Sequence, residues 1–149
     1  GLGDVYKRQG VVFQDFRLLP DRNVYENIAF AQKVVEAPNR KIKSRVLAML
    51  SMVGLLDKYK AFPNELSGGE QQRVAIARAL ITHPSVIFAD EPTGNLDAVS
   101  AETVAKMLTL AASKYQQTIV MVTHDRQMAE YADRILTITD GNVTGGVGV

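Results

Sequence analysis

Residues 66 to 97 hold the feature that most constrains the fold, a helix start with two glycines followed by a strand that ends in carboxylates. The helix start is Leu66-Ser67-Gly68-Gly69-Glu70, and the apolar strand from Val86 to Ala89 leads into Asp90-Glu91-Pro92. In open α/β sheets, ligands bind beyond the carboxyl ends of the strands. This order of elements therefore predicts an α/β domain with a ligand site at one edge of its sheet.

Apolar spacing and capping residues predict alternating strands and helices over the rest of the chain. Continuous apolar runs at 86–89 and 118–122 are typical of strands buried in a parallel sheet. The pair Asp140-Gly141 predicts a hairpin turn between 135–138 and Val143. The predicted strands are 10–13, 86–89 and 118–122, and the predicted helices are 24–33, 39–53, 68–82, 98–115 and 125–132. This alternation predicts a mostly parallel sheet flanked by helices.

Ser67 and Glu70 have the spacing of a capping box, which satisfies free backbone N–H groups at many helix starts. From the four residues 67–70 alone, an ordinary cap and a binding site are equally good interpretations. The intervening Gly68 and Gly69 favour binding, because glycine weakens a helix but leaves backbone N–H groups open to a phosphate.

Asp90 and Glu91 follow the central predicted strand, where an acidic pair is most often a solvated turn. Phosphoryl transfer gives a stronger reason for the pair, because it needs one carboxylate for Mg²⁺ and another to orient and deprotonate water. Gln14 and His124 also follow predicted strands, so a parallel sheet would bring both to the edge that carries Asp90 and Glu91. Each of them alone would be weak evidence.

Charge and composition exclude several classes of protein. The 149 residues carry 17 basic and 16 acidic side chains, for a net charge of +1, so no basic surface indicates nucleic-acid binding. There is no cysteine, which excludes disulfides and thiolate metal sites. No apolar run is long enough to span a bilayer, and no signal-peptide pattern is visible, so a cytoplasmic location is expected.

The motifs together resemble those of the ABC ATPase family, in family order, from Gly10 to about Val143. The segment 66–70 is similar to the family signature, 86–91 to its Walker B strand, and 95–97 to its D-loop. His124 is similar to the switch histidine and Gln14 to the Q-loop glutamine. The resemblance implies a P-loop NTPase-like fold, here a partial domain over 10–143, with a helical signature subdomain at about 23–83.

The resemblance also implies a set of roles with ATP and Mg²⁺ as cofactors. Glu91, His124 and Gln14 would be catalytic, Glu91 as the general base, and Asp90 and Gln14 would hold Mg²⁺. The nucleotide-binding residues would be Ser67, Gly68, Gly69, Glu70 and Asp97. The signature of one subunit would close on ATP held by the other, which makes a homodimer.

A membrane partner is implied as well. The segment 12–20 and the start of the following helix are similar to the branch of the family that acts in cell division, whose ATPases work with an integral membrane permease. By this resemblance Phe16, Arg17, Leu18 and Leu19 would dock the permease, placing the protein at the inner face of the plasma membrane. Alternatives are an ATPase of a lipoprotein-, macrolide- or peptide-export transporter, and a non-catalytic nucleotide-binding module.

Both ends of the chain depart from the family pattern. Nothing matches the P-loop motif G-x-x-x-x-G-K-[ST], so the chain is expected to be truncated at its N-terminus and inactive by itself. Residues 1–9 fit the family poorly and are interpreted as non-native or a remnant. The glycine-rich residues 144–149 are expected to form a disordered tail.

Overall fold

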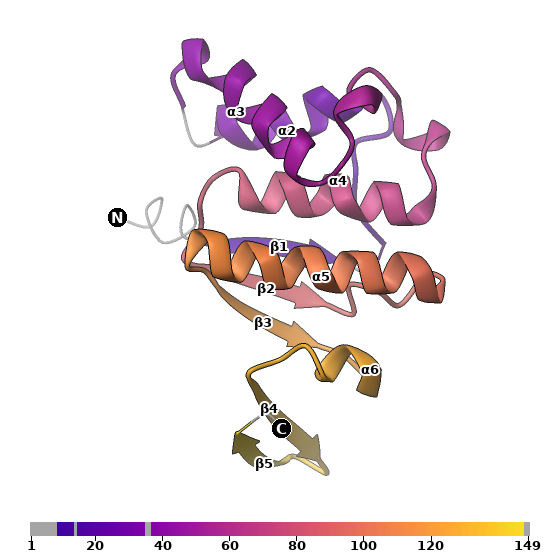
Figure 1. The fold of residues 1–149 in the computed structure, drawn as a ribbon, viewed down its shortest axis with the longest axis vertical. Coiled ribbons are helices and arrows are strands. Elements are labelled where there is room, and N and C mark those ends of the chain that lie inside the picture. The colour runs from indigo at the N-terminus through magenta and orange to yellow at the C-terminus, as the bar shows by residue number, and fades with distance from the viewer. Residues whose placement is uncertain (1–8, 14, 35–36, 148–149) are drawn as a thin grey trace.

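In the computed structural model, residues 9–13, 15–34 and 37–147 are described, and they alternate strands with helices (Figure 1). Helices α2, α3 and α4 lie at one end of the molecule, and the β4–β5 hairpin lies at the other. The elements are β1 (Gln9–Phe13), α2 (Val24–Val34), α3 (Asn39–Met52), η1 (Leu56–Lys58), η2 (Pro63–Glu65), α4 (Gly68–Leu80), β2 (Val86–Asp90), α5 (Ala98–Tyr115), β3 (Thr118–Val122), α6 (Arg126–Ala129), β4 (Arg134–Thr139) and β5 (Asn142–Val147).

Side-chain caps fix the starts of helices α2, α4 and α5. In α4 the Glu70 N–H donates to Ser67 Oγ at 3.2 Å, and the Ser67 N–H donates to Glu70 Oε1 at 2.9 Å. Asp97 Oδ1 accepts from the Ser100 N–H at 2.7 Å at the start of α5, and Asn23 Oδ1 caps α2 at 2.8 Å. The capping predictions are confirmed at all three sites, because each side chain satisfies a backbone N–H that has no partner within its helix.

Strands β1, β2 and β3 form a parallel sheet in that order, as the alternation predicted. Ile87 and Ala89 point into the core, on the face of the sheet that α4 and α5 contact. Val11, Phe88 and Val120 pair across the three strands in one row and are 41%, 42% and 44% exposed. The prediction of strands buried on both faces is therefore wrong for the described residues, since one face carries an open apolar row.

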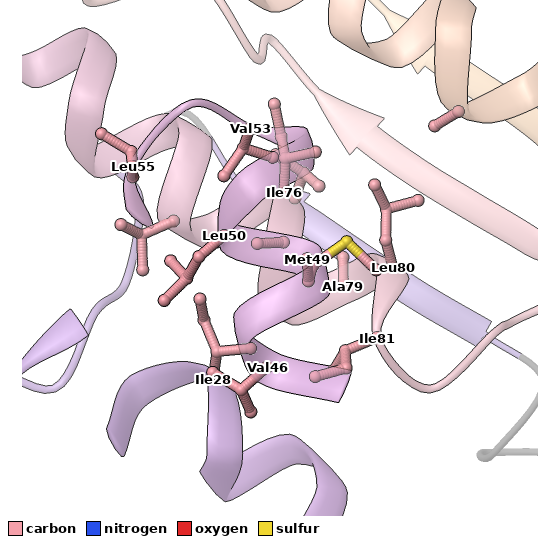
Figure 2. Packing of buried hydrophobic residues seen from close by; sticks show 14 of the residues in the cluster. Ile28, Val46, Met49, Leu50, Val53, Leu55, Ile76, Ala79, Leu80 and Ile81 are labelled. Atoms are coloured by element: carbon pink, nitrogen blue, oxygen red, sulfur yellow. The ribbon is translucent and has the colours of Figure 1, made fainter. Parts of the chain in front are cut away.

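The hydrophobic core lies mainly between helices α2, α3 and α4 (Figure 2). Ile28 of α2, Val46 and Leu50 of α3, and Ile76 and Leu80 of α4 are all completely buried. Each such side chain contributes about 1.5–3 kcal/mol of burial. Because α4 also contacts β1 and α5, it connects the helical subdomain to the sheet. Among the described residues, no helix is long and apolar enough to cross a membrane.

The structure corrects several element boundaries. Helix α4 ends at Leu80 and α6 at Ala129, each before the predicted end. The hairpin is confirmed, with Asp140 and Gly141 at φ 50° and 79° in the turn. Strand β5 continues to Val147, so the expectation of a disordered tail is wrong for residues 144–147, because they pair with β4. Residues 1–8, 148 and 149 lie outside the described residues.

Candidate functional site

The three parallel strands end level with one another, at the edge where the sequence predicted a site. Phe13, Asp90 and Val122 are register partners at the ends of β1, β2 and β3. Glu91 follows at φ 46°, and its N–H donates to the Val122 carbonyl at 2.8 Å. A left-handed backbone costs a non-glycine residue about 1–2 kcal/mol. The turn therefore holds Glu91 in one specific position above the end of β3.

Glu91 and His124 meet at this edge although 33 residues separate them. The His124 N–H donates to Glu91 Oε1 at 3.0 Å, and His124 Nε2 lies 3.5 Å from the same oxygen. The Glu91 side chain is 21% exposed and the His124 side chain 98% exposed. Among the described residues, Glu91 Oε2 makes no hydrogen bond and is not one of the buried unpaired oxygens, so water can reach it.

The two residues expected to bind metal have different outcomes. Asp90 ends β2 with an exposed side chain, next to Glu91. Gln14, expected to be both catalytic and a Mg²⁺ ligand, lies outside the described residues. Within 9–13, 15–34 and 37–147, no three His, Cys, Asp or Glu side chains form a group that could hold a metal ion. Any metal held here would therefore need ligands from elsewhere in addition to Asp90.

Glu70 is fixed more firmly than a capping residue alone would be. Its Oε2 forms an ion pair with Lys58, and its Oε1 accepts the Ser67 N–H. The Lys58 ammonium group and the Ser67 N–H lower the pKa of Glu70 from 4.5 to about 2. Glu70 is therefore ionised at any physiological pH, and it holds the turn on which the exposed Ser67 lies.

The two glycines of the signature have different surroundings. A Cβ atom on Gly68 would meet nothing closer than Leu96 Cδ2 at 3.5 Å, which is ordinary contact. On Gly69 it would lie 2.7 Å from Ser100 Oγ and 2.8 Å from Ser100 Cβ. The sequence analysis explained both glycines by access of a phosphate to the backbone. In the structure, Gly69 is also required for packing, because α4 and α5 approach closely at this point.

The signature segment also contacts the loops that follow β2. Leu96 of the Asn95-Leu96-Asp97 segment packs beside Gly68, and the buried Gln72 donates from Nε2 to the Pro92 carbonyl. Sequence reasoning did not assign a role to Gln72, Ser100 or Lys58. Gln72 could have been recognised from the sequence, because it places an amide on a helix face that is otherwise apolar. Among the described residues, no hydrogen bond or ion pair joins Ser67, Gly68 or Gly69 to Glu91 or His124.

Comparison with known proteins decides the family. The sequence profile described as ABC transporter matches residues 3–94, which is more than half of the chain and begins within the doubtful segment 1–9. The chain belongs to the ABC transporter family. This assignment agrees with the parallel sheet, the capped signature turn and the acidic pair at the end of β2.

Several ABC proteins are similar to most of the chain. The cell division ATP-binding protein FtsE of Streptococcus pneumoniae is 49% identical over 135 residues, which cover 90% of this chain and 58% of FtsE. FtsE of Escherichia coli K12 is 47% identical over 140 residues, covering 93% and 63%. The chain thus spans about three fifths of the length of these relatives.

A solved structure of the same family supports the fold. It is a dimeric ATP-binding cassette in a post-hydrolysis state, bound to ADP and phosphate. It is 35% identical to this chain, with a TM-score of 0.82, and the similarity covers 97% of this chain and 66% of the other. The P-loop NTPase-like prediction is therefore confirmed as a partial ABC ATPase fold.

Proposed function

We propose that this chain is part of an ATP-binding and ATP-hydrolysing subunit of an ABC-type membrane complex with the cell-division role that the name FtsE describes. The observation that carries the proposal is the contact of Glu91 with His124 at the sheet edge. Its support from the comparisons is the 46–49% identity to FtsE proteins over most of the chain.

The described residues offer groups that suit ATP and Mg²⁺: backbone N–H groups for phosphate and carboxylate oxygens for the metal ion. Ser67 and Gly68 leave a helix N-terminus open, and this is a favourable environment for phosphate. Asp90 offers the carboxylate oxygens that Mg²⁺ prefers, with Gln14 as the second proposed ligand. Bound Mg²⁺ would neutralise charge on the phosphates.

Glu91 is the proposed general base. Its Oε1 is held by the His124 N–H, while Oε2 is available to accept a proton from the attacking water. The exposed His124 imidazole would donate to the terminal phosphate from the same edge. Ser67, Gly68, Gly69 and Glu70 would close on nucleotide bound by the partner subunit, and Asp97 would place the D-loop between the two sites.

The assembly we propose is a homodimer at the cytoplasmic face of the plasma membrane. Two copies would enclose ATP between them, in line with the dimeric state named for the similar structure. An FtsX-like permease would dock at Phe16, Arg17, Leu18 and Leu19. Co-purification of an export permease in place of an FtsX-like one would favour the transporter alternative.

A substitution in an extended protein tests the proposed chemistry. The extended protein is this chain preceded by the N-terminal segment of E. coli FtsE, which supplies the P-loop. Glu91→Gln should lower ATP turnover by about 100-fold or more while ATP binding remains, because the base is lost and the phosphate contacts are kept. Glu102→Gln is the matched control, because Glu102 forms an exposed pair with Lys106 on α5. Equal turnover in the two variants would refute the role of Glu91.

We also propose that the chain without the extension hydrolyses no ATP. A single helix N-terminus does not replace a phosphate-binding loop and its lysine. Phosphate release from this chain above the level of its own Glu91→Gln variant would contradict the proposal.

A further inference from the structure

The segment 16–19, which follows β1, has a backbone that the chain would not adopt by itself. Phe16 and Arg17 both have positive φ, at 64° and 50°, and neither is glycine. The Arg17 N–H donates to the Asp15 carbonyl at 2.7 Å, which closes a three-residue γ-turn at Phe16. Turns of this type with positive φ are rare and strained. Surrounding groups must therefore hold the segment in place.

One such group is Arg78 in the last turns of α4. Its Nη1 donates to the Arg17 carbonyl at 2.7 Å, and its Nη2 donates to the Phe16 carbonyl at 3.1 Å. The rigid fork of a guanidinium can bind two neighbouring carbonyls at once, which a lysine ammonium group cannot do in the same geometry. Burial lowers the pKa of Arg78, so its hydrogen bonds to these carbonyls compensate for a desolvated charge.

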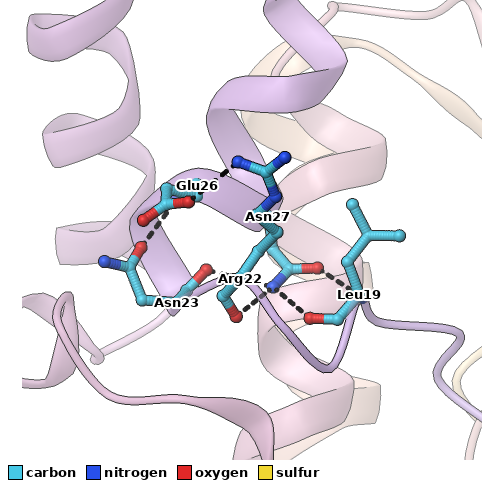
Figure 3. Close-up of polar contacts among 5 residues, drawn as sticks. All are labelled: Leu19, Arg22, Asn23, Glu26 and Asn27. Atoms are coloured by element: carbon cyan, nitrogen blue, oxygen red, sulfur yellow. Dashed lines mark hydrogen bonds and ion pairs between the residues drawn. The ribbon is translucent and has the colours of Figure 1, made fainter.

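The second group is Asn27 of α2, whose side chain is almost completely buried (Figure 3). Its Oδ1 accepts from the Leu19 N–H at 2.7 Å, and its Nδ2 donates to the Leu19 carbonyl at 3.2 Å. Nδ2 also donates to the carbonyls of Arg22 and Asn23, both at 3.0 Å. One amide thus contacts four backbone groups, and the two hydrogens of Nδ2 are shared among three carbonyls. A carboxylate of the same shape would place an oxygen against three carbonyl oxygens.

We propose that Arg78 and Asn27 are positioning residues that hold segment 16–19 in a preformed shape for the membrane partner. This inference rests on the proposed function, in which that segment docks the permease. The side chains of Arg17 and Leu19 are exposed at the surface where a partner would bind, while the backbone between them stays fixed. A preformed backbone removes the ordering cost from the binding step.

The same contacts provide a route to the signature. Arg78 and Gly68 lie on one helix, ten residues and about 15 Å apart along its axis. A partner that displaces the carbonyls of Phe16 and Arg17 therefore acts directly on the helix whose N-terminus carries Ser67. Segment 16–19 thus reaches α4 at two points: the Arg78 guanidinium binds its backbone, and the Phe16 ring lies beside Gly68, where an added Cβ atom would be 3.7 Å from Phe16 Cζ.

Hydrogen exchange on this chain tests the fixed backbone. In Asn27→Asp the Leu19 N–H should exchange about 10- to 100-fold faster than in the parent chain, because the carboxylate lacks the Nδ2 donors and its second oxygen would face carbonyl oxygens, which opens the segment. Asn23→Asp is the matched control, since Asp caps a helix as well as Asn does and, among the described residues, the Asn23 side chain bonds to the Glu26 N–H and not to Leu19. Equal exchange at Leu19 in the two variants would overturn the role of Asn27.

Partner binding tests the positioning role in the extended protein, with an FtsX-like permease in lipid nanodiscs as the probe. Arg78→Lys should weaken permease binding about tenfold and keep the urea unfolding midpoint close to that of the parent protein, which a general loss of structure would not do. Arg45→Lys is the control, because Arg45 makes one side-chain bond to Gln32 elsewhere. Leu19→Asp should weaken binding by at least as much.

The outcomes separate the inference from the proposed function. If Leu19→Asp weakens permease binding and Arg78→Lys does not, the positioning role of Arg78 is wrong and the docking proposal stands. If the parent protein binds no permease, or Leu19→Asp binds it normally, docking at this segment is wrong, and the inference fails with it.

Discussion

Gly69→Ala should destabilise the protein, whereas Gly68→Ala should not. The two residues are neighbours in the first turn of α4, and neither has a left-handed φ. The two substitutions therefore differ mainly in the room available for the added Cβ atom. At Gly69 the new methyl group would lie 2.7 Å from Ser100 Oγ and 2.8 Å from Ser100 Cβ. At Gly68 the nearest atom is 3.5 Å away.

The expected magnitude follows from two opposing effects. Overpacking of this kind costs about 1–3 kcal/mol, and replacing glycine by alanine in a helix recovers up to about 1 kcal/mol. Gly69→Ala should therefore lower the free energy of unfolding by about 1–2 kcal/mol. Gly68→Ala should leave it unchanged or raise it by up to about 1 kcal/mol.

Urea unfolding followed by circular dichroism measures both variants, and a second substitution identifies the atom responsible. Ser100→Gly removes both clashing atoms and leaves Ser100 Cα, at 3.8 Å, as the nearest atom, so it should rescue Gly69→Ala in a double-mutant cycle. Ser100→Ala keeps the Cβ atom and should not rescue it. Equal stability of the Gly68 and Gly69 variants would refute the packing explanation.

Two further predictions concern the signature turn. Because the folded pKa of Glu70 lies at about 2, below its ordinary 4.5, its stabilisation is present above pH 4.5 and is lost as pH falls toward 2. Lys58 is partly exposed, so this contribution is about 1 kcal/mol. Lys58→Met should remove it in urea titrations at pH 6 and 3, and an unchanged pH dependence would contradict the assignment. In the extended protein with Glu91→Gln, Ser67→Arg should abolish ATP-dependent dimerisation in analytical ultracentrifugation. If the dimer still forms, the role across the interface is wrong and Ser67 acts only as a helix cap.

Local chemistry explains which parts of the fold the sequence predicted. Ser67, Asn23 and Asp97 each cap a helix by bonding to the N–H of a residue three positions later. Both partners of each bond can therefore be recognised from a short stretch of sequence. The meeting of Glu91 with His124 was also predictable, because parallel strands bring their carboxyl ends to a single edge.

Other features depend on contacts between distant segments, which no local pattern records. Arg78 binds carbonyls 61 and 62 residues away, and the approach of Ser100 to Gly69 depends on how two helices cross. The open row of Val11, Phe88 and Val120 has the same apolar sequence that a covered strand would have. Periodicity indicates which side chains are apolar, but it does not show what covers them.

The left-handed backbone of Glu91 has a consequence for how this site can change by mutation. Glycine at this position would relax the turn, since glycine adopts positive φ without the penalty that a Cβ atom imposes. A screen that selects only for thermal stability should therefore enrich Glu91→Gly and discard the carboxylate at the same time. With the role of general base proposed for Glu91, stability and chemistry compete at this residue, so selection for hydrolysis would keep a strained turn that selection for stability alone would remove.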